Sequence, residues 1–307
     1  MLQETNLRRF SILQTFFQIL VVIGIFIYIF NNYSIIFEFE NPNYLQFSLT
    51  IFLKSLNVLV VGYLNYFAFK ILYRKISYMP ILKIHILSLF GNFFSFAKSG
   101  TVYKAGALKK IYNLKLKEFS LFFIVSQLFP LLIISFVTFS YIKATSLDNS
   151  LSNLFLIVFI VITVFIFSIK MYISKISKID DRMYMKKLFD IPNISKIFLI
   201  QLLAMVINLI YNWTLSNSLG YTLSFFDNLI YTTTSVISIF LSLTPNALGI
   251  KEFIIINLGS IADFTPERMF NLSIAERFSD VLMLLIIFLI IKLSGNNLSL
   301  KNNENNY

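Results

Sequence analysis

Long apolar runs separated by short polar segments occupy most of this chain. Six of the runs are about 20 residues long, the length that an α-helix needs to cross the hydrocarbon core of a bilayer. They cover residues 10–30, 45–69, 119–142, 153–169, 197–216 and 269–291. The first run follows Arg8 and Arg9, but no small-residue cleavage site comes after it, so we interpret it as a retained anchor. The pattern predicts six transmembrane helices.

Two further apolar stretches are too short or too broken for a simple crossing. Residues 84–97 form a run of only 14 residues. Residues 228–244 are followed by Pro245 and Gly249, and a second run covers 253–262. Short runs of this kind are typical of re-entrant segments. We therefore predict two re-entrant helical hairpins; the alternative is an ordinary eight-span bundle with two short helices.

The basic residues alternate between connecting segments. Most of the 26 Lys and Arg residues lie in 1–9, 70–83, 98–117, 170–196 and the tail. The segments 31–44, 143–152, 217–227 and 246–268 hold only Lys143, Lys251 and Arg268. By the positive-inside rule, both termini are cytoplasmic and the protein lies in the cytoplasmic (inner) membrane. The first hairpin then enters from the cytoplasmic face and the second from outside.

Composition narrows the chemistry that the chain can perform. The sequence is 57% apolar and 13% charged, with a mean hydropathy of +0.76. It has no Cys, which excludes disulfides, thiolate metal sites and a Cys nucleophile, and its single His85 cannot build a His-based metal cluster or a Ser-His-Asp triad. We expect no metal and no cofactor. In so apolar a chain, the net charge of +11 indicates membrane topology rather than nucleic-acid binding.

The two halves of the chain repeat one order of elements: span, span, hairpin, span. A shift of 149 residues superimposes Gly100 on Gly249, Glu118 on Glu267, and Gln127 on Glu276. Because each unit crosses the membrane three times, the second unit is inverted relative to the first. We predict one all-α integral membrane domain, 1–295, with units at about 10–142 and 153–291, and a disordered polar tail at 296–307. Inverted repeats with broken segments are typical of secondary transporters.

The broken segment of the second half supplies candidate binding residues. Pro245 ends the first arm, and Gly249 permits a backbone conformation that other residues resist. The helix that begins after Gly249 presents unpaired N–H groups, which favour an anion. Lys251 adds a positive charge, and Glu252 is expected to pair with Lys251 or with Arg277.

The first hairpin tip has similar chemistry, with Lys98, Gly100, Tyr103 and Lys104 close together. We predict that Lys98, Lys104 and Lys251 bind a phosphate jointly. The breaks of such repeats commonly lie at the substrate site.

The last span carries Glu276, Arg277 and Asp280. Ionised groups at this depth must face the protein interior and pair. They are candidates for headgroup contact or for a proton-linked switch; the alternative is an Arg277–Asp280 clamp that only fixes helix packing. Lys54, within the second span, either snorkels to the interface or is functional.

Three of these segments resemble a known family. The segment 242–253, the Glu276-Arg277 pair and the segment 100–110 resemble the transmembrane region of the lysylphosphatidylglycerol synthase/flippase family. The resemblance implies a membrane domain that translocates lipids with charged or glycosylated headgroups. Two-part members add a soluble aminoacyltransferase domain; the longest polar stretch here, 170–196, is far too short for one. We therefore expect no synthase activity. Gln127 departs from the family, where a Glu is common.

We carry three hypotheses on function. The leading one is a non-enzymatic, flippase-like transporter of a phospholipid or polyprenyl-phosphate-linked lipid with an anionic or phosphorylated headgroup. The second is a membrane-embedded, lipid-linked glycosyltransferase, for which Glu38 and Glu40 would bind a metal. The third is a non-transporting partner of enzymes that assemble cell-envelope lipids or glycans.

Overall fold

The computed structural model describes residues 43–72, 76–94, 98–145, 149–175, 187–241, 247, 249–258 and 265–293. The predicted first span, the Glu38–Glu40 pair, Pro245 and the tail 296–307 lie outside these residues. Every described element is an α-helix, so the all-α fold class is confirmed. In the first half the helices are α3 (Tyr44–Leu72), α4 (Tyr78–Phe94), α5 (Ser99–Tyr112) and α6 (Leu116–Thr145). In the second half they are α7 (Asn149–Lys175), α9 (Ile191–Ser218), α10 (Phe225–Leu241), α11 (Ile250–Leu258) and α12 (Pro266–Leu293).

Three of the described helices are long and apolar enough to cross a membrane. These are α3, over Tyr44–Ile71, α6, over Leu116–Thr145, and α9, over Ile191–Ser218. They coincide with three of the spans predicted from the sequence. The predicted spans at 153–169 and 269–291 are also helical, within α7 and α12. The helices therefore suit a membrane protein.

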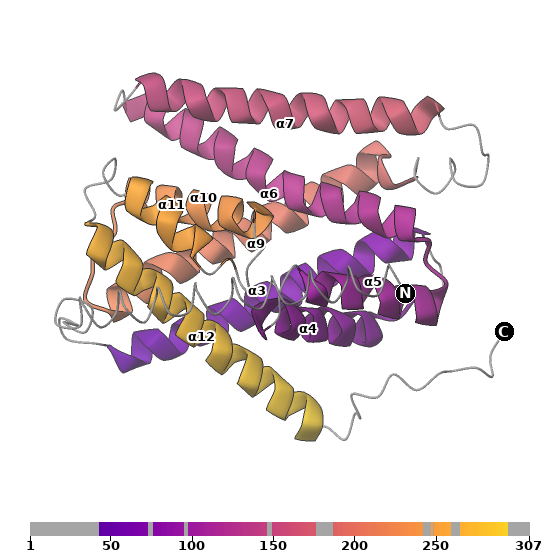
Figure 1. The fold of residues 1–307 in the computed structure, drawn as a ribbon, viewed down its shortest axis with the longest axis horizontal. Helices are drawn as coiled ribbons and strands as arrows, with labels where there is room; N and C mark the ends of the chain where they lie inside the picture. The colour runs from indigo at the N-terminus through magenta and orange to yellow at the C-terminus, as the bar shows by residue number, and fades with distance from the viewer. Residues whose placement is uncertain are drawn as a thin grey trace, which may run out of the picture.

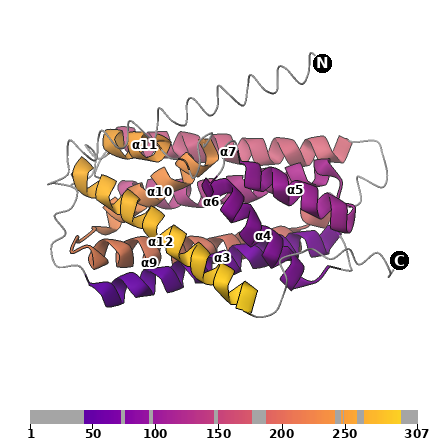
Figure 2. The ribbon, with the colours of Figure 1, turned by 60° about the horizontal axis from the view of Figure 1, so that its bottom comes forward.

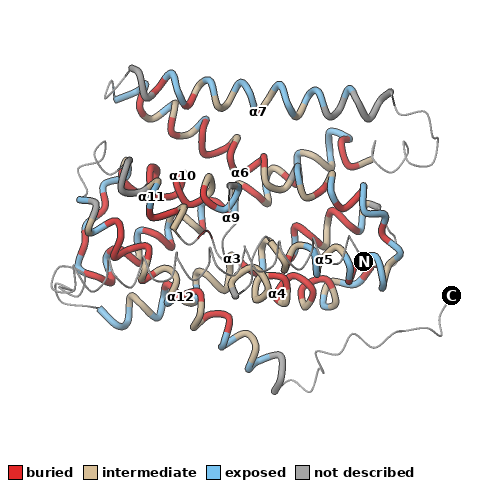
Figure 3. The backbone as a smooth tube through the Cα atoms, viewed as in Figure 1, coloured by how far each residue is buried: buried red, intermediate tan, exposed pale blue. Residues whose placement is uncertain are grey.

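The helices form an elongated bundle in which the two halves interlock (Figures 1 and 2). The long helices α3 and α9, one from each half, pack along each other. On the outside α7 lies against α6, and many of its residues are exposed (Figure 3). A row of large apolar side chains is among them. That row includes Ile157, Ile160, Val161, Val164, Phe165 and Phe167.

The neighbour relations of the first half recur in the second. Helix α4 packs on α3 and α5, as α10 packs on α9 and α11. Helix α6 contacts α9 and α10; in the same way, α12 contacts α3 and shares an apolar cluster with α4. The starts of α9, α10, α11 and α12 fall within two residues of the starts of α3, α4, α5 and α6 shifted by 149. The order and spacing of these helices thus agree with the internal repeat.

Both predicted hairpins correspond to pairs of short helices that pack on each other. The first pair differs from the sequence prediction, which ended the apolar hairpin at Ala97 and treated 98–117 as a basic connecting segment. Instead, α5 runs through that segment and buries Ala107 and Leu108 against the core, while Lys109 and Lys110 stay exposed. The basic residues Lys109 and Lys110 lie on the exposed side of this helix, so its other side is apolar and can pack against the core.

Two glycines allow α4 and α5 to approach closely. A Cβ built on Gly100 would lie only 1.8 Å from the carbonyl oxygen of Ser88, and one built on Gly91 would lie 2.7 Å from the Gly100 Cα. Hydrogen bonds fix the crossing: Ser99 Oγ donates to the Gly91 carbonyl at 3.1 Å, and the Thr101 N–H donates to Asn92 Oδ1 at 3.1 Å. Gly100, predicted to bind substrate, thus has a packing role in this structure.

Candidate functional site

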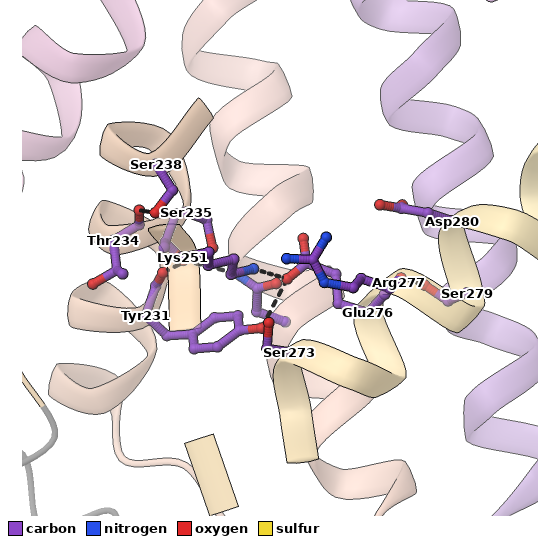
Figure 4. A network of polar contacts seen from close by, with 12 residues as sticks. Tyr231, Thr234, Ser235, Ser238, Lys251, Ser273, Glu276, Arg277, Ser279 and Asp280 are labelled. Atoms are coloured by element: carbon purple, nitrogen blue, oxygen red, sulfur yellow. Dashed lines mark hydrogen bonds and ion pairs between the residues drawn. The ribbon is translucent and has the colours of Figure 1, made fainter. Parts of the chain in front are cut away.

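Glu276 of α12 is the centre of a cluster of buried polar groups (Figure 4). Its carboxylate forms an ion pair with Lys251 of α11 and accepts a hydrogen bond from the Tyr231 hydroxyl of α10 at 2.8 Å. The Lys251 ammonium also lies over the Tyr231 ring, 4.5 Å from its centroid. The cluster therefore joins both arms of the second hairpin to the last helix.

Glu252 makes a second set of contacts beside the first. Its Oε1 accepts hydrogen bonds from Arg277 Nη2 at 2.6 Å and from Ser273 Oγ at 2.8 Å. Its Oε2 accepts the N–H of Gly249 at 2.7 Å. Gly249 has a φ of 82° and directly precedes α11, so Glu252 reaches back three residues to cap its own helix, as in a capping box. The helix start that we expected to receive an anion thus holds a carboxylate of the chain itself.

Lys54 links this network to the other half of the chain. Its ammonium lies 2.9 Å from Asp280 Oδ1 and 3.5 Å from Glu276 Oε1. It also lies over the Tyr211 ring, 4.6 Å from the centroid. Because Lys54 belongs to α3 and the two carboxylates to α12, the ion pairs hold the two halves together. Of the two roles considered for Lys54, snorkelling to an interface is wrong for this structure.

The network as a whole balances its formal charges. The cations are Lys54, Lys251 and Arg277, and the anions are Glu252, Glu276 and Asp280. Groups buried in this way must be paired, since removing one partner from a buried pair typically costs about 3–5 kcal/mol. The geometry is that of a clamp between helices, with Glu252 as a partner of Arg277. Lys251, predicted to bind phosphate, is here engaged by Glu276.

Two adjacent cavities lie beside the network. The smaller has a volume of about 240 Å³ and is lined by Lys98 of the first hairpin tip, Ala247 of the second, and Lys54, Glu276 and Asp280. The larger has a volume of about 360 Å³ and is lined by α3, α4, α5, α6, α9 and α10. They share several lining residues, among them Lys54, Asn92 and Gln127. We call the smaller part the tip chamber, the larger part the amide chamber, and the two together the central cavity.

Lys98 and Lys104 face the central cavity without a carboxylate partner among the described residues. Lys98 donates to the carbonyl oxygen of Phe240 at 3.0 Å and lies over the rings of Phe123 and Phe240. This contact connects the tip of the first hairpin to the end of α10. Lys104 donates to Asn65 Oδ1. These two predicted cations therefore lie in the central cavity, whereas Lys251 and Arg277 belong to the clamp.

Two other predicted residues, Tyr103 and Gly100, lie away from the clamp and the central cavity. Tyr103 is exposed on the outer face of α5. Gly100 is buried at the crossing of α4 and α5. Gln127, the repeat counterpart of Glu276, lines both chambers.

The sequence analysis missed several polar residues that line the amide chamber. On α3, the missed residues are Asn57 and Asn65, which line it together with Lys54 and Val61. Their spacing of three or four residues places them on one helix face, which is a signal that the sequence contained. His85, which the apolar run 84–97 hid, is 6% exposed and faces the same chamber.

No group of three or more His, Asp or Glu side chains is arranged to hold a metal ion in the part of the chain that the structure describes. The Glu38–Glu40 pair, the candidate metal site of the glycosyltransferase hypothesis, lies outside it. Comparison of the chain with protein-family models, with curated proteins and with solved structures finds no match.

Proposed function

We propose that this protein is a flippase-like membrane transporter that moves, or helps to move, a lipid with an anionic or phosphorylated headgroup. One observation carries the proposal: a cavity between apolar helices, with a mainly apolar lining, holds Lys98 and Lys104, whose partners among the described residues are uncharged. Polar and ionisable groups inside apolar helices commonly mark the path of a substrate. The lipid tails would remain in the bilayer while the headgroup occupies the cavity.

The proposed membrane arrangement is six spans and two re-entrant hairpins. The protein lies in the inner membrane, and both termini face the cytoplasm. The lengths of α4 and α5 support it, since 17 and 14 residues reach only about 26 and 21 Å at 1.5 Å per residue. The hydrocarbon core is about 30 Å thick. The recurring neighbour relations support the repeat, and the basic flanks of the first hairpin support its cytoplasmic entry.

The position of the cavity supports a transport cycle by rocking. Both hairpin tips contribute to the tip chamber, and each half contributes one helix of the packed α3–α9 pair. In inverted-repeat transporters the substrate site lies between the repeats, and one repeat rocks against the other. The ion pairs of Lys54 with α12 cross that boundary. The resemblance of segments 100–110 and 242–253 to the lipid-flippase family is consistent with this arrangement.

Reconstitution in liposomes tests the proposal. Fluorescent lipids in the outer leaflet are quenched by a membrane-impermeant reductant, and the protected fraction reports movement between leaflets. We expect the protein to move an anionic phospholipid faster than protein-free vesicles do. We also expect Lys98→Gln with Lys104→Gln to lower the rate about tenfold, the effect of losing about 1.4 kcal/mol of interaction.

A matched control removes two charges elsewhere on α5. Lys109 and Lys110 are exposed and do not line the central cavity, so Lys109→Gln with Lys110→Gln should leave the rate within about twofold. If the protein moves no labelled anionic lipid, or if both double variants behave alike, the transporter proposal is wrong. The role of a non-transporting partner would then remain.

A further inference from the structure

The lining of the amide chamber is mainly apolar, but it contains an unusual set of polar side chains. Six carboxamide side chains face it: Asn57, Asn65, Asn92, Gln127, Gln201 and Asn208. They come from four sequence-distant helices, α3, α4, α6 and α9, so their convergence is a product of the tertiary structure. No Asp or Glu lines the chamber in the described part of the chain. Lys104 therefore adds a positive charge that no neighbouring carboxylate cancels.

Several of these groups retain free hydrogen-bonding capacity. Within the described residues, the side chains of Gln127, Asn208, Ser88 and His85 form no hydrogen bond, although His85 and Ser88 are 6% and 4% exposed. Buried polar groups are normally satisfied by protein, water or a ligand. A chamber of about 360 Å³ lies within the usual size range of ligand sites, roughly 300–1,000 Å³. The free groups therefore point to a ligand with many hydrogen-bonding atoms.

The chemistry of the lining selects the class of ligand. A carboxamide offers both donors and acceptors, and so matches a hydroxyl group, which also donates and accepts. The Lys104 ammonium donates one of its three hydrogens to Asn65, which leaves two for an anion. An amine-bearing headgroup would need a carboxylate, and the nearest carboxylates, Glu276 and Asp280, are already engaged by Lys54 and Lys251.

We propose that the amide chamber binds a phosphate-linked cyclic polyol, such as an inositol or a hexose. The phosphate lies beside Lys104 and His85, and the hydroxyls bond to the amides of Asn208 and Gln127. This inference rests on the proposed function, and it specifies the headgroup that the transporter accepts. It excludes choline, ethanolamine and aminoacyl headgroups as preferred substrates.

Binding of soluble headgroups to the purified full-length protein in detergent tests the inference. The probes are a hexose 1-phosphate, inositol 1-phosphate, inorganic phosphate and phosphocholine, measured by calorimetry. We expect the two polyol phosphates to bind at least about tenfold more tightly than the other two probes, because each unmade hydrogen bond leaves a buried group unpaired.

Near-isosteric variants separate the two parts of the site. Gln127→Met and Asn208→Leu should each abolish the preference for polyol phosphates over inorganic phosphate. Lys104→Met should instead weaken the binding of all the anionic probes. Asn153→Leu, at an exposed position of α7, is the matched control and should change nothing. Thermal unfolding of each variant identifies any loss of fold. Gln127 and Asn208 are replaced in separate single variants, so each tests the inference by itself.

The outcomes distinguish this inference from the proposed function. Equal affinity for phosphocholine and hexose phosphate, or a polyol preference that survives both amide variants, would overturn the inference. If liposomes show equal transport of phosphatidylinositol and phosphatidylcholine, the inference fails and the transporter proposal stands. If no lipid moves but polyol phosphates bind as expected, the transporter proposal fails and the chamber assignment stands.

Discussion

The crossing of α4 and α5 gives a sharp prediction, because one methyl group decides it. In Gly100→Ala, the new Cβ would lie 1.8 Å from the Ser88 carbonyl oxygen and 2.6 Å from the Asn92 backbone nitrogen. Both atoms belong to the backbone of α4 and cannot rotate away. The two helices must separate by more than an ångström to restore an ordinary contact.

The cost can be estimated from the contacts that separation disturbs. Overpacking a close contact typically costs about 1–3 kcal/mol. Separation also weakens the hydrogen bonds from Ser99 to Gly91 and from Thr101 to Asn92, each worth about 1 kcal/mol. The better helix propensity of Ala returns about 1 kcal/mol. We therefore expect a net loss of about 2–4 kcal/mol.

The matched control lies on the same helix. A Cβ at Gly106 would have no atom within 4 Å, so Gly106→Ala should gain the propensity term and leave stability unchanged or raised by up to about 1 kcal/mol. Thermal unfolding of the purified protein in one detergent measures both variants. The reasoning fails if Gly100→Ala unfolds at the wild-type temperature, or if Gly106→Ala is destabilised to the same extent.

Three further predictions concern the ion-pair clamp and the topology. Glu276→Gln should destabilise the protein by about 3–5 kcal/mol, because it leaves the buried Lys251 of α11 without its carboxylate partner and leaves Lys54 of α3 with Asp280 alone; a wild-type melting temperature would contradict this. Arg277→Lys should lose part of the two-pronged contact with Glu252 and cost about 1–3 kcal/mol, and a double-mutant cycle with Glu252→Gln should give a coupling above about 0.5 kcal/mol; strict additivity would refute a direct interaction. Single cysteines in this Cys-free chain should react with an impermeant reagent from one face when they flank the first hairpin, and from the other face when they flank the second; a hairpin whose flanks react from opposite faces is a crossing. The exposed positions for this test are Ser77 and Lys117 for the first hairpin, and Thr222 and Arg268 for the second.

The clamp shows where sequence reasoning about charges reached its limit. The sequence of the last span predicts that Glu276, Arg277 and Asp280 must pair, because an unpaired ionised group inside an apolar helix is costly. The sequence does not identify their partners. The alternative of an Arg277–Asp280 clamp considered only neighbours along one helix, whereas the structure joins Asp280 to Lys54 of α3 and Arg277 to Glu252 of α11.

The cavity shows the same limit for uncharged residues. Asn57, Asn65 and Asn208 look unremarkable in sequence, since isolated Asn residues in apolar helices commonly bond to neighbouring helices. Asn212 does so, with its amide donating to Thr232 at 2.8 Å. Asn208, only one turn away on α9, faces the amide chamber instead. The local sequence of a helix therefore does not determine whether an Asn side chain bonds to a neighbouring helix or faces a cavity.

The sequence by itself determined most of the described helices, their approximate bounds and their repeated order; the exception is α5, which lies in a segment that we expected to be a connection. The reason is local: in an apolar environment each segment must satisfy its own backbone hydrogen bonds, so a long apolar run has little choice but to be helical. Only the tertiary structure decided that Lys251 is neutralised by Glu276 while Lys104 faces an amide-lined chamber. Those outcomes depend on how each helix is rotated and how deeply it packs against partners far away in the chain, which no local pattern of residues specifies.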